Sequence, residues 1–261
     1  AADGGVDRFD SEAIFESTPE PDLSRSEAIT QFLDRRFAAP FRVLWDDWRG
    51  KIGIGLLSGF VLTAIFGPIL LDPPNTQIED AGLRPFETME YPLGTDVGGR
   101  GLFTETVYAA RPMLEMIVAG AIFAILVGAG IGMVAGYKGG FVDQVLMFIT
   151  DTMLTIPGVP LIIVISVVIN PKEPWLIGLI LAIDNWPGLT RAVRSQVLPL
   201  RDVEYVESSR IMGVSTPRII WEDMVPNLMP YVTINFANAS RGIIFESVGL
   251  YFLGVLPTTQ P

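Results

Sequence analysis

A run of twenty residues without a charge, residues 52–71, constrains this chain more than any other feature of its sequence. At about 1.5 Å per residue, a helix of that length crosses the roughly 30 Å hydrocarbon core of a bilayer. Apolar residues make up 49% of the chain, which is typical of a protein embedded in lipid. The sequence therefore predicts a membrane protein whose first span is residues 52–71.

Four further apolar stretches predict four more spans, at about residues 112–137, 141–169, 175–192 and 228–254. The third stretch contains Pro157 and Pro160, each of which removes a backbone donor, so we expect a kink or break there. The fourth has Pro187-Gly188 near its end. We predict an all-α polytopic membrane helix bundle with about five transmembrane helices.

Small residues recur every four positions along the second span, at Gly120, Ala124, Gly128, Gly132 and Gly136. In lipid, such a ridge lets a neighbouring helix approach closely, which is a main source of helix association. We expect Gly128, Gly132 and Gly136 to serve helix packing rather than ligand binding.

The distribution of Lys and Arg predicts the orientation, because basic residues concentrate on the cytoplasmic side. Residues 1–51 hold seven and residues 188–227 hold five, whereas residues 72–111 hold three. Five crossings then place the N-terminus and the loop 201–227 inside, and the ordered loop 72–111 outside.

We divide the chain into three parts. Residues 1–50 form an acidic cytoplasmic tail that ends in an amphipathic helix around residues 29–48, which can lie at the membrane surface. Residues 51–111 hold the first transmembrane helix and an extracellular loop. Residues 112–261 form the transmembrane core.

Composition excludes several functions. The chain has no Cys and no His, so thiolate chemistry and imidazole metal sites are absent, and we expect no metal. A net charge of −11 argues against nucleic-acid binding. Only three of the 18 basic residues are Lys, which is typical of halophile proteins, although codon bias gives the same pattern.

A charged, amphipathic segment, residues 204–226, lies between the last two spans, and we call it the elbow. Its first helix is expected to group Glu204, Glu207 and Arg210 on one face and to end at Gly213. The opposite face would hold Tyr205, Val206, Ser209 and Met212.

A second short helix is expected after Gly213, capped by Thr216, with Pro217 in its first turn and Pro226 as its limit. Arg218 and Glu222 can pair along it, and Ile220 and Met224 face one way. The elbow is too short and polar to cross lipid, so it is either a docking site for a soluble partner or only an interfacial loop.

Charges inside predicted spans are candidates for function. Asp151, Arg241 and Glu246 lie deepest, and we expect them to pair with one another or to line a substrate path. The charges nearer to span ends are expected at the membrane interface: Glu115, Asp143 and Asp184.

The elbow resembles the cytoplasmic loop of ABC importer permeases. In that family, Glu-Ala-Ala is followed by Gly and, further on, by an Ile-x-Leu-Pro ending. This chain has Glu207-Ser208-Ser209, then Gly213, then Asp223-Met224-Val225-Pro226. Glu, Gly and Pro keep their spacing, whereas serines replace the alanines and Asp223 replaces the Ile.

Three other motifs resemble the dipeptide/oligopeptide permeases of the C type, from about Arg49 to the last residue. They are Pro92-Leu93-Gly94-Thr95-Asp96, Ala135-Gly136-Tyr137-Lys138-Gly139-Gly140, and Tyr251-Phe252-Leu253-Gly254. The family implies a sixth span after Gly254. Since the chain starts without Met and stops at Pro261, we expect it to be truncated.

The resemblance implies the type I importer permease fold, in which separate ABC ATPase subunits, a second permease subunit and an extracellular substrate-binding protein complete the transporter. This chain would bind no cofactor, because ATP and Mg²⁺ belong to the ATPase; residues 94–101 are glycine-rich but lack the Lys of a phosphate loop. The residues expected to couple to the ATPase are Glu204, Glu207, Ser208, Ser209, Arg210, Gly213, Arg218, Asp223 and Pro226.

The expected function is a permease subunit of a peptide importer in the cytoplasmic membrane, with no enzymatic activity of its own. A transporter or channel driven by ion gradients would also explain the spans and the buried charges, but it would not need the elbow. A membrane scaffold without a transport role is a third alternative.

Overall fold

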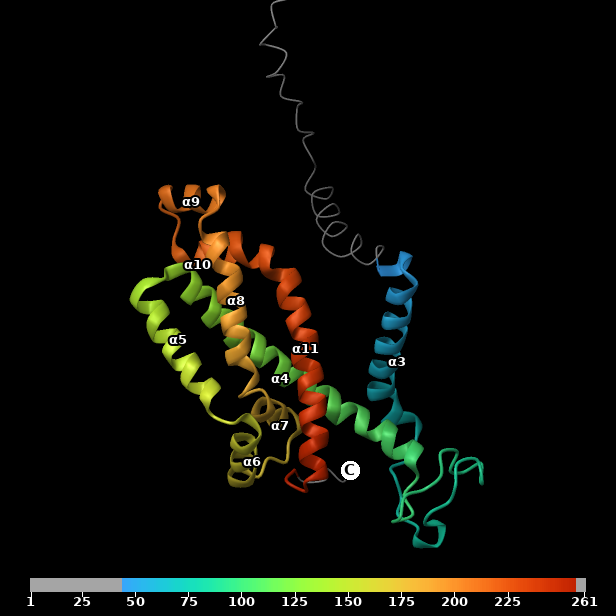
Figure 1. Cartoon of the computed structure of the whole chain (residues 1–261). Helices are drawn as coiled ribbons and strands as arrows, with labels where there is room; N and C mark the ends of the chain where they lie inside the picture. Colours follow the sequence, from blue (N-terminus) through green and yellow to red (C-terminus); the bar gives the residue numbers. More distant parts are fainter. Residues whose placement is uncertain (1–43, 257–261) are drawn as a thin grey trace, which may run out of the picture. The chain divides into compact units, whose positions relative to one another are not determined.

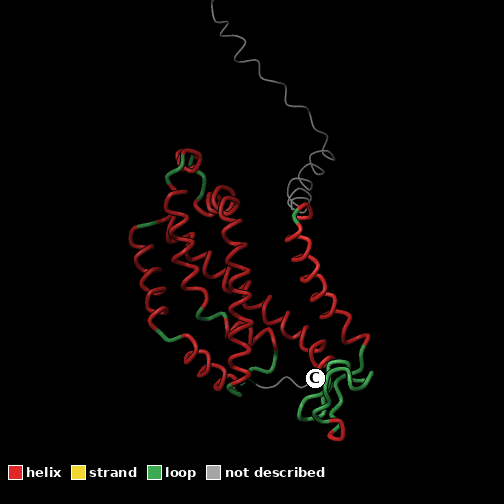
Figure 2. Tube along the Cα trace, turned by 45° about the vertical axis from the view of Figure 1, so that its right-hand side comes forward, coloured by secondary structure: helices red, strands yellow, loops and turns green. Residues whose placement is uncertain are grey.

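The computed structural model describes residues 44–256. Most of the predicted acidic tail and amphipathic helix lies outside these residues. The chain divides into two units, Ala1–Ser58 and Gly59–Pro261, with the boundary inside the first long helix. Within the described range the structure is helical, and its only β-pairing is two isolated bridges (Figures 1 and 2).

Two long helices match the first two predicted spans. They are α3 (Trp48–Leu70) and α4 (Leu102–Lys138), and both are long and apolar enough to cross a membrane. The predicted second span began at residue 112, but α4 starts ten residues earlier because Pro112 sits inside it without ending it.

The third predicted span is broken where the two prolines predicted it. Helix α5 (Gly140–Thr155) ends before Ile156, which is extended, and α6 (Gly158–Ile169) follows at an angle of 84°. A residue that precedes proline disfavours the helical conformation, and Ile156 precedes Pro157. The break is confirmed, and as one bent unit the pair has the composition of a span.

The fourth predicted span is wrong as one continuous helix. The structure has α7 (Pro174–Leu181) and α8 (Asn185–Arg201), separated by a turn. The side-chain amide of Asn185 donates to the Leu181 carbonyl at 3.0 Å, a local bond that competes with a continuing helix. Helix α8 continues past the predicted end to Arg201, and Asp202 and Val203 join it to the elbow.

The elbow contains α9 (Glu204–Ile211), α10 (Thr216–Ile219) and a π-helical turn, η3 (Ile220–Met224), and it leads into α11 (Val225–Phe252). In Figure 1, α9 and α10 lie at one end of α8 and α11, while α6 and α7 lie towards the other end. Among the described helices, α7, α8 and α11 are not apolar and long enough to qualify as spans alone, so the count of five stays a prediction.

Helix α4 is the centre of the core, and its glycine ridge faces α7 and α8. A Cβ atom at Gly128 would lie 2.9 Å from the Trp186 carbonyl oxygen, and one at Gly132 would lie 2.6 Å from that of Thr190. At Gly136 a Cβ would lie 2.8 Å from the Cβ of Val197. The helix backbones therefore touch along this ridge, as close packing of small residues in lipid requires.

The loop between α3 and α4 is ordered, as predicted. It holds a short 3₁₀ helix, η2 (Ile78–Asp80), and residues 94–101 form turns. The Asp96 carboxylate accepts hydrogen bonds from the backbone N–H groups of Gly98 and Arg100, both at 2.8 Å. The Arg100 bond is the main reason why the pKa of Asp96 lies below its usual value.

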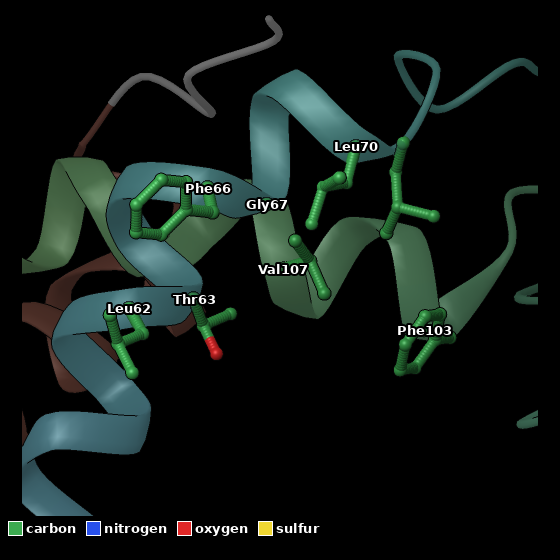
Figure 3. A pocket seen from close by; sticks show the side chains of 8 residues that line it. Leu62, Thr63, Phe66, Gly67, Leu70, Phe103 and Val107 are labelled. Carbon is green, nitrogen blue, oxygen red and sulfur yellow. The ribbon is translucent and has the colours of Figure 1, made fainter.

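The last turns of α3 and the first turns of α4 enclose an apolar pocket of about 500 Å³. Figure 3 shows Leu62, Phe66 and Leu70 on one wall and Phe103 and Val107 on the other. Its lining contains no charged side chain, which suits a surface that faces lipid.

Candidate functional site

Helix α9 is a short helix with a well-defined stop. Glu204 and Glu207 lie in its first turn, where carboxylates interact favourably with the helix dipole. At its end, the Gly213 N–H donates to the Arg210 carbonyl and the Val214 N–H donates to the Ser209 carbonyl, both at 3.0 Å. This Schellman motif requires the left-handed conformation that Gly213 adopts, with φ of 76°.

Three side chains anchor the elbow in the core. Val206, Ile219 and Met224 are fully buried, and they share one apolar cluster with α4, α8 and α11. The cluster also contains Ala129, Leu189, Val193, Val197 and Leu228. In addition, the Asn227 side-chain amide donates to the Tyr205 hydroxyl at 3.1 Å, which ties α9 to the start of α11.

The predicted faces of α9 need a correction. Of the four residues predicted to share the face opposite the charges, only Val206 is buried, whereas Tyr205 and Met212 are exposed. The prediction groups Arg210 with Glu204 and Glu207, but its guanidinium turns towards the core, where it lies over the Tyr137 ring and donates to the Arg201 carbonyl at 3.2 Å. A helix of two turns packs by its ends as well as by its faces, so helical periodicity alone misplaces these residues.

The second half of the elbow also differs from the prediction. Ser215, rather than Thr216, occupies the N-cap of α10, without a side-chain capping bond. The chain does not end its helix at Pro226, because η3 passes directly into α11 and Pro226 lies in the first turn of α11. Proline is tolerated there because a first-turn N–H needs no intrahelical partner.

Arg218 and Glu222 form the expected ion pair, with Nε and Oε2 2.8 Å apart. Asp223 is half-buried beside it, and its backbone carbonyl accepts from the Asn227 amide at 2.6 Å. Ser208 is exposed and its hydroxyl donates to the Glu204 carbonyl at 2.8 Å, while Ser209 is half-buried.

The elbow exposes three large apolar side chains, whose exposure the sequence reasoning did not predict. Ile211 is 80% exposed, and Met212 and Trp221 are each 73% exposed. Ile211 and Met212 come directly before Gly213 at the end of α9, whereas Trp221 lies in η3. The available signal was the adjacency of Ile211 and Met212 to a helix-stopping glycine in an otherwise polar segment.

The predicted mutual pairing of Asp151, Arg241 and Glu246 is wrong. Asp151 instead accepts from Arg191 on α8, with Oδ1 and Nη2 2.6 Å apart. Asp143 pairs in the same way with Arg194, at 2.5 Å. These two bridges join α5 to α8, because the arginines, three residues apart, project from the same face of α8.

Arg241 has no ion pair within the described part of the chain and is exposed. Glu246 lies near Asn185, whose amide is 3.4 Å from each of its carboxylate oxygens and 3.2 Å from Asp184. Glu246 also lines a pocket of about 280 Å³ between α6 and α11 that is otherwise apolar. In residues 44–256, no three acidic side chains gather as a metal site.

The sequence profile of one family, described as the binding-protein-dependent transport system inner membrane component, matches residues 128–260. The match covers half of the chain and includes α8, the elbow and α11. The chain belongs to this family.

Curated relatives agree with this assignment. The dipeptide transport system permease protein DppC of Alkalihalophilus pseudofirmus is 31% identical over 91% of this chain and 78% of its own length. The corresponding DppC of Bacillus subtilis is 33% identical over 80% of this chain and 68% of its own. The oligopeptide transport system permease protein OppC of Bacillus subtilis is 31% identical over 78% and 67%, respectively.

As a member of the binding-protein-dependent inner membrane components, the chain is a multi-pass protein of the cytoplasmic membrane and a permease subunit of an ABC importer. It is a transport subunit rather than an enzyme, and ATP hydrolysis lies in separate subunits. The family works with ATPase and substrate-binding partners in general. The comparisons give no support to transport driven by ion gradients.

Proposed function

We propose that this chain is the permease subunit of a peptide importer and that the elbow couples it to the ATPase. The substrate class is supported by relatives whose names specify dipeptide or oligopeptide transport. The coupling is supported by one observation above all: the elbow is anchored by fully buried side chains, while Ile211 and Met212 at its tip, the end of α9, and Trp221 on η3 are exposed.

This construction suits the transmission of force. A partner that grips the exposed side chains would move α9, and Val206 and Ile219 would carry that motion into the cluster shared with α4, α8 and α11. Because α10, η3 and α11 follow one another without a loop, a displacement of α10 also turns α11. Packed helices respond to such a load by rigid-body rotation or small shear movements.

The remaining subunits follow from this role. A second permease subunit would pair with this one, and an extracellular binding protein would deliver the peptide. ATP and Mg²⁺ would bind in the ATPase subunits, and this chain would hold no cofactor.

Glu246 is our candidate for a residue on the substrate path. It is a half-buried carboxylate at a pocket of about 280 Å³, and within residues 44–256 it has no cationic partner. An unpaired charge at membrane depth is costly, so such residues usually serve transport. Arg241 and Asp151 are weaker candidates, the latter because Arg191 neutralises it.

The test replaces Gly213 in the transporter reconstituted with its partner subunits. Gly213→Val forces a β-branched residue into the left-handed region, although no atom lies within 4 Å of the added Cβ. The resulting backbone strain of roughly 1–2 kcal/mol should reshape the turn. We therefore expect peptide uptake to fall at least about tenfold. Membrane insertion should be unchanged, because only the turn is affected.

Gly130→Val is the matched control, since its Cβ also meets nothing within 4 Å and the position is helical. It should transport normally. Gly213→Asn should retain part of the activity, because Asn tolerates the left-handed conformation. Normal uptake by Gly213→Val would contradict the coupling role.

A further inference from the structure

A basic pocket lies where the elbow meets the core, and the coupling role does not account for it. It is a cavity of about 490 Å³ at the ends of four helices, α4, α8, α9 and α10. Its lining residues are Tyr137, Lys138, Arg201, Asp202, Arg210 and Thr216. The volume falls within the range of pockets that hold small ligands.

The charges in this pocket are unbalanced. It has three cations and one carboxylate, which leaves a formal charge of +2 in a chain whose net charge is −11. The carboxylate is paired with one of the cations, because Asp202 Oδ1 lies 3.2 Å from Arg201 Nε. Among the described residues, no carboxylate lies within 4 Å of Lys138 or Arg210, so these two cations are available to an anion.

The arginines are held in place before any ligand arrives. The Arg210 guanidinium lies 5.7 Å from the centroid of the Tyr137 ring and donates to the Arg201 carbonyl. Arg201 passes close to Gly139, where a Cβ atom would lie 3.2 Å from its Nη1. Pre-organised donors lose less conformational entropy on binding than mobile ones do.

This set of donors fits a phosphate group. Guanidinium groups present planar, paired N–H donors to phosphate oxygens, and a Lys ammonium adds a point charge. The Thr216 hydroxyl, which has no hydrogen-bond partner within residues 44–256, is a further donor.

The position of the pocket favours a lipid phosphate over a free one. Lys138 is the last residue of α4, a helix with the length and composition of a membrane span, so the pocket lies near the predicted cytoplasmic surface. Cations near helix C-termini also balance the helix dipole. That effect explains each cation singly, whereas it does not explain why three of them converge on one cavity.

We propose that the basic pocket binds the phosphate of an anionic phospholipid headgroup. The bound headgroup joins Arg210 of α9 to Lys138 of α4 and Arg201 of α8, so it holds the elbow against the core. The lipid composition of the cytoplasmic leaflet thereby sets how firmly the elbow is held. Basic pockets between transmembrane helices bind lipid headgroups by the same chemistry.

The test measures lipid binding by the full-length chain in a neutral detergent, using native mass spectrometry. Phosphatidylglycerol is titrated against phosphatidylcholine, and inorganic phosphate is tested separately. The variant is K138Q/R210Q, and the charge-matched control is K172Q/R218Q, which removes two exposed cations outside the pocket.

Each basic side chain near an anionic lipid contributes about a fivefold factor, so K138Q/R210Q should weaken phosphatidylglycerol binding about 30-fold. The control should stay within about twofold of the native chain, and phosphatidylcholine should bind weakly to all three. Equal losses in variant and control would overturn the proposal, because they indicate diffuse electrostatics.

Two other results would also overturn it. Saturation by inorganic phosphate alone, with the same loss in K138Q/R210Q, would assign the pocket to a soluble anion. Unchanged lipid binding together with lost ATPase association in the same variant would assign the cations to the partner protein. None of these readouts requires transport, so the proposal and the coupling role can fail separately.

Discussion

The glycine ridge of α4 and the elbow both depend on glycine, but for different physical reasons. Along the ridge, backbones touch and there is no room for even one added carbon, as at Gly132 against Thr190. In the elbow, Gly213 has open space around it and is required only for its backbone conformation. The glycines of the ridge are therefore required because they let two helices pack closely. Gly213 is required because it adopts the left-handed conformation that ends α9.

The largest effect is expected on the ridge. Gly132→Leu would push a side chain into the Thr190 carbonyl and Val193, and overpacking of this kind costs about 3 kcal/mol or more. We expect little folded protein, measured as the monodisperse fraction in detergent. Gly130→Leu, two residues away with open space, is the control and should fold. Similar yields for both variants would mean that the ridge tolerates added side chains, which would contradict the close packing on which the comparison with the elbow rests.

Next in size is a comparison of two isoleucines of the elbow. Ile219 is 1% exposed and Ile211 is 80% exposed. Ile219→Ala should destabilise the fold by about 2–5 kcal/mol, because it leaves a cavity in the shared cluster. Ile211→Ala should change stability by at most about 0.5 kcal/mol while lowering ATP-driven uptake. Stability is measured by unfolding in a denaturing detergent.

Two results would contradict this prediction. If Ile211→Ala unfolds as readily as Ile219→Ala, the tip of the elbow is part of the core rather than a surface for a partner. If neither variant is destabilised, the anchors do not hold the elbow.

The smallest effect is expected for the exposed ion pair. Glu222→Gln should change the free energy of unfolding very little, because water and salt screen ion pairs as exposed as this one. The Glu222 carboxylate raises the pKa of Arg218, chiefly through its hydrogen bond. A raised pKa stabilises the fold at every pH below that of the unfolded Arg, so unfolding should show no pH dependence from this pair between pH 5 and 9, a range chosen for the assay. A marked loss of stability in Glu222→Gln would contradict this prediction, because it would mean that the pair is shielded from water.

Local sequence signals predicted those features whose cause is itself local. The proline pair at the start of α6, the glycine that stops α9 and the four-residue spacing on α4 each act within one or two turns. These features could therefore be predicted from the sequence alone.

Features that depend on contacts between distant segments were not predictable. Asp151 has Arg191 as its partner because α5 packs along α8, and depth in a span carries no information about that neighbour. The turn between α7 and α8 contains no proline or glycine from which it could be predicted. It is stabilised by the hydrogen bond from the Asn185 side chain to the Leu181 carbonyl. Pro226 could end one helix or begin the next, and only the path of η3 decides. The halophile interpretation and the three-part division of the chain stay predictions.

The central claim is that the tip of the elbow touches an ATPase. The chain has no Cys, so a single Cys can be placed at Met212 on the elbow or, as a control, at Val168 on α6, which is 78% exposed. In the assembled transporter, we expect thiol cross-linking from position 212 to join this chain to the ATPase subunit, and position 168 to give no such product. Cross-linking from 168 but not from 212, or from neither, would contradict the account.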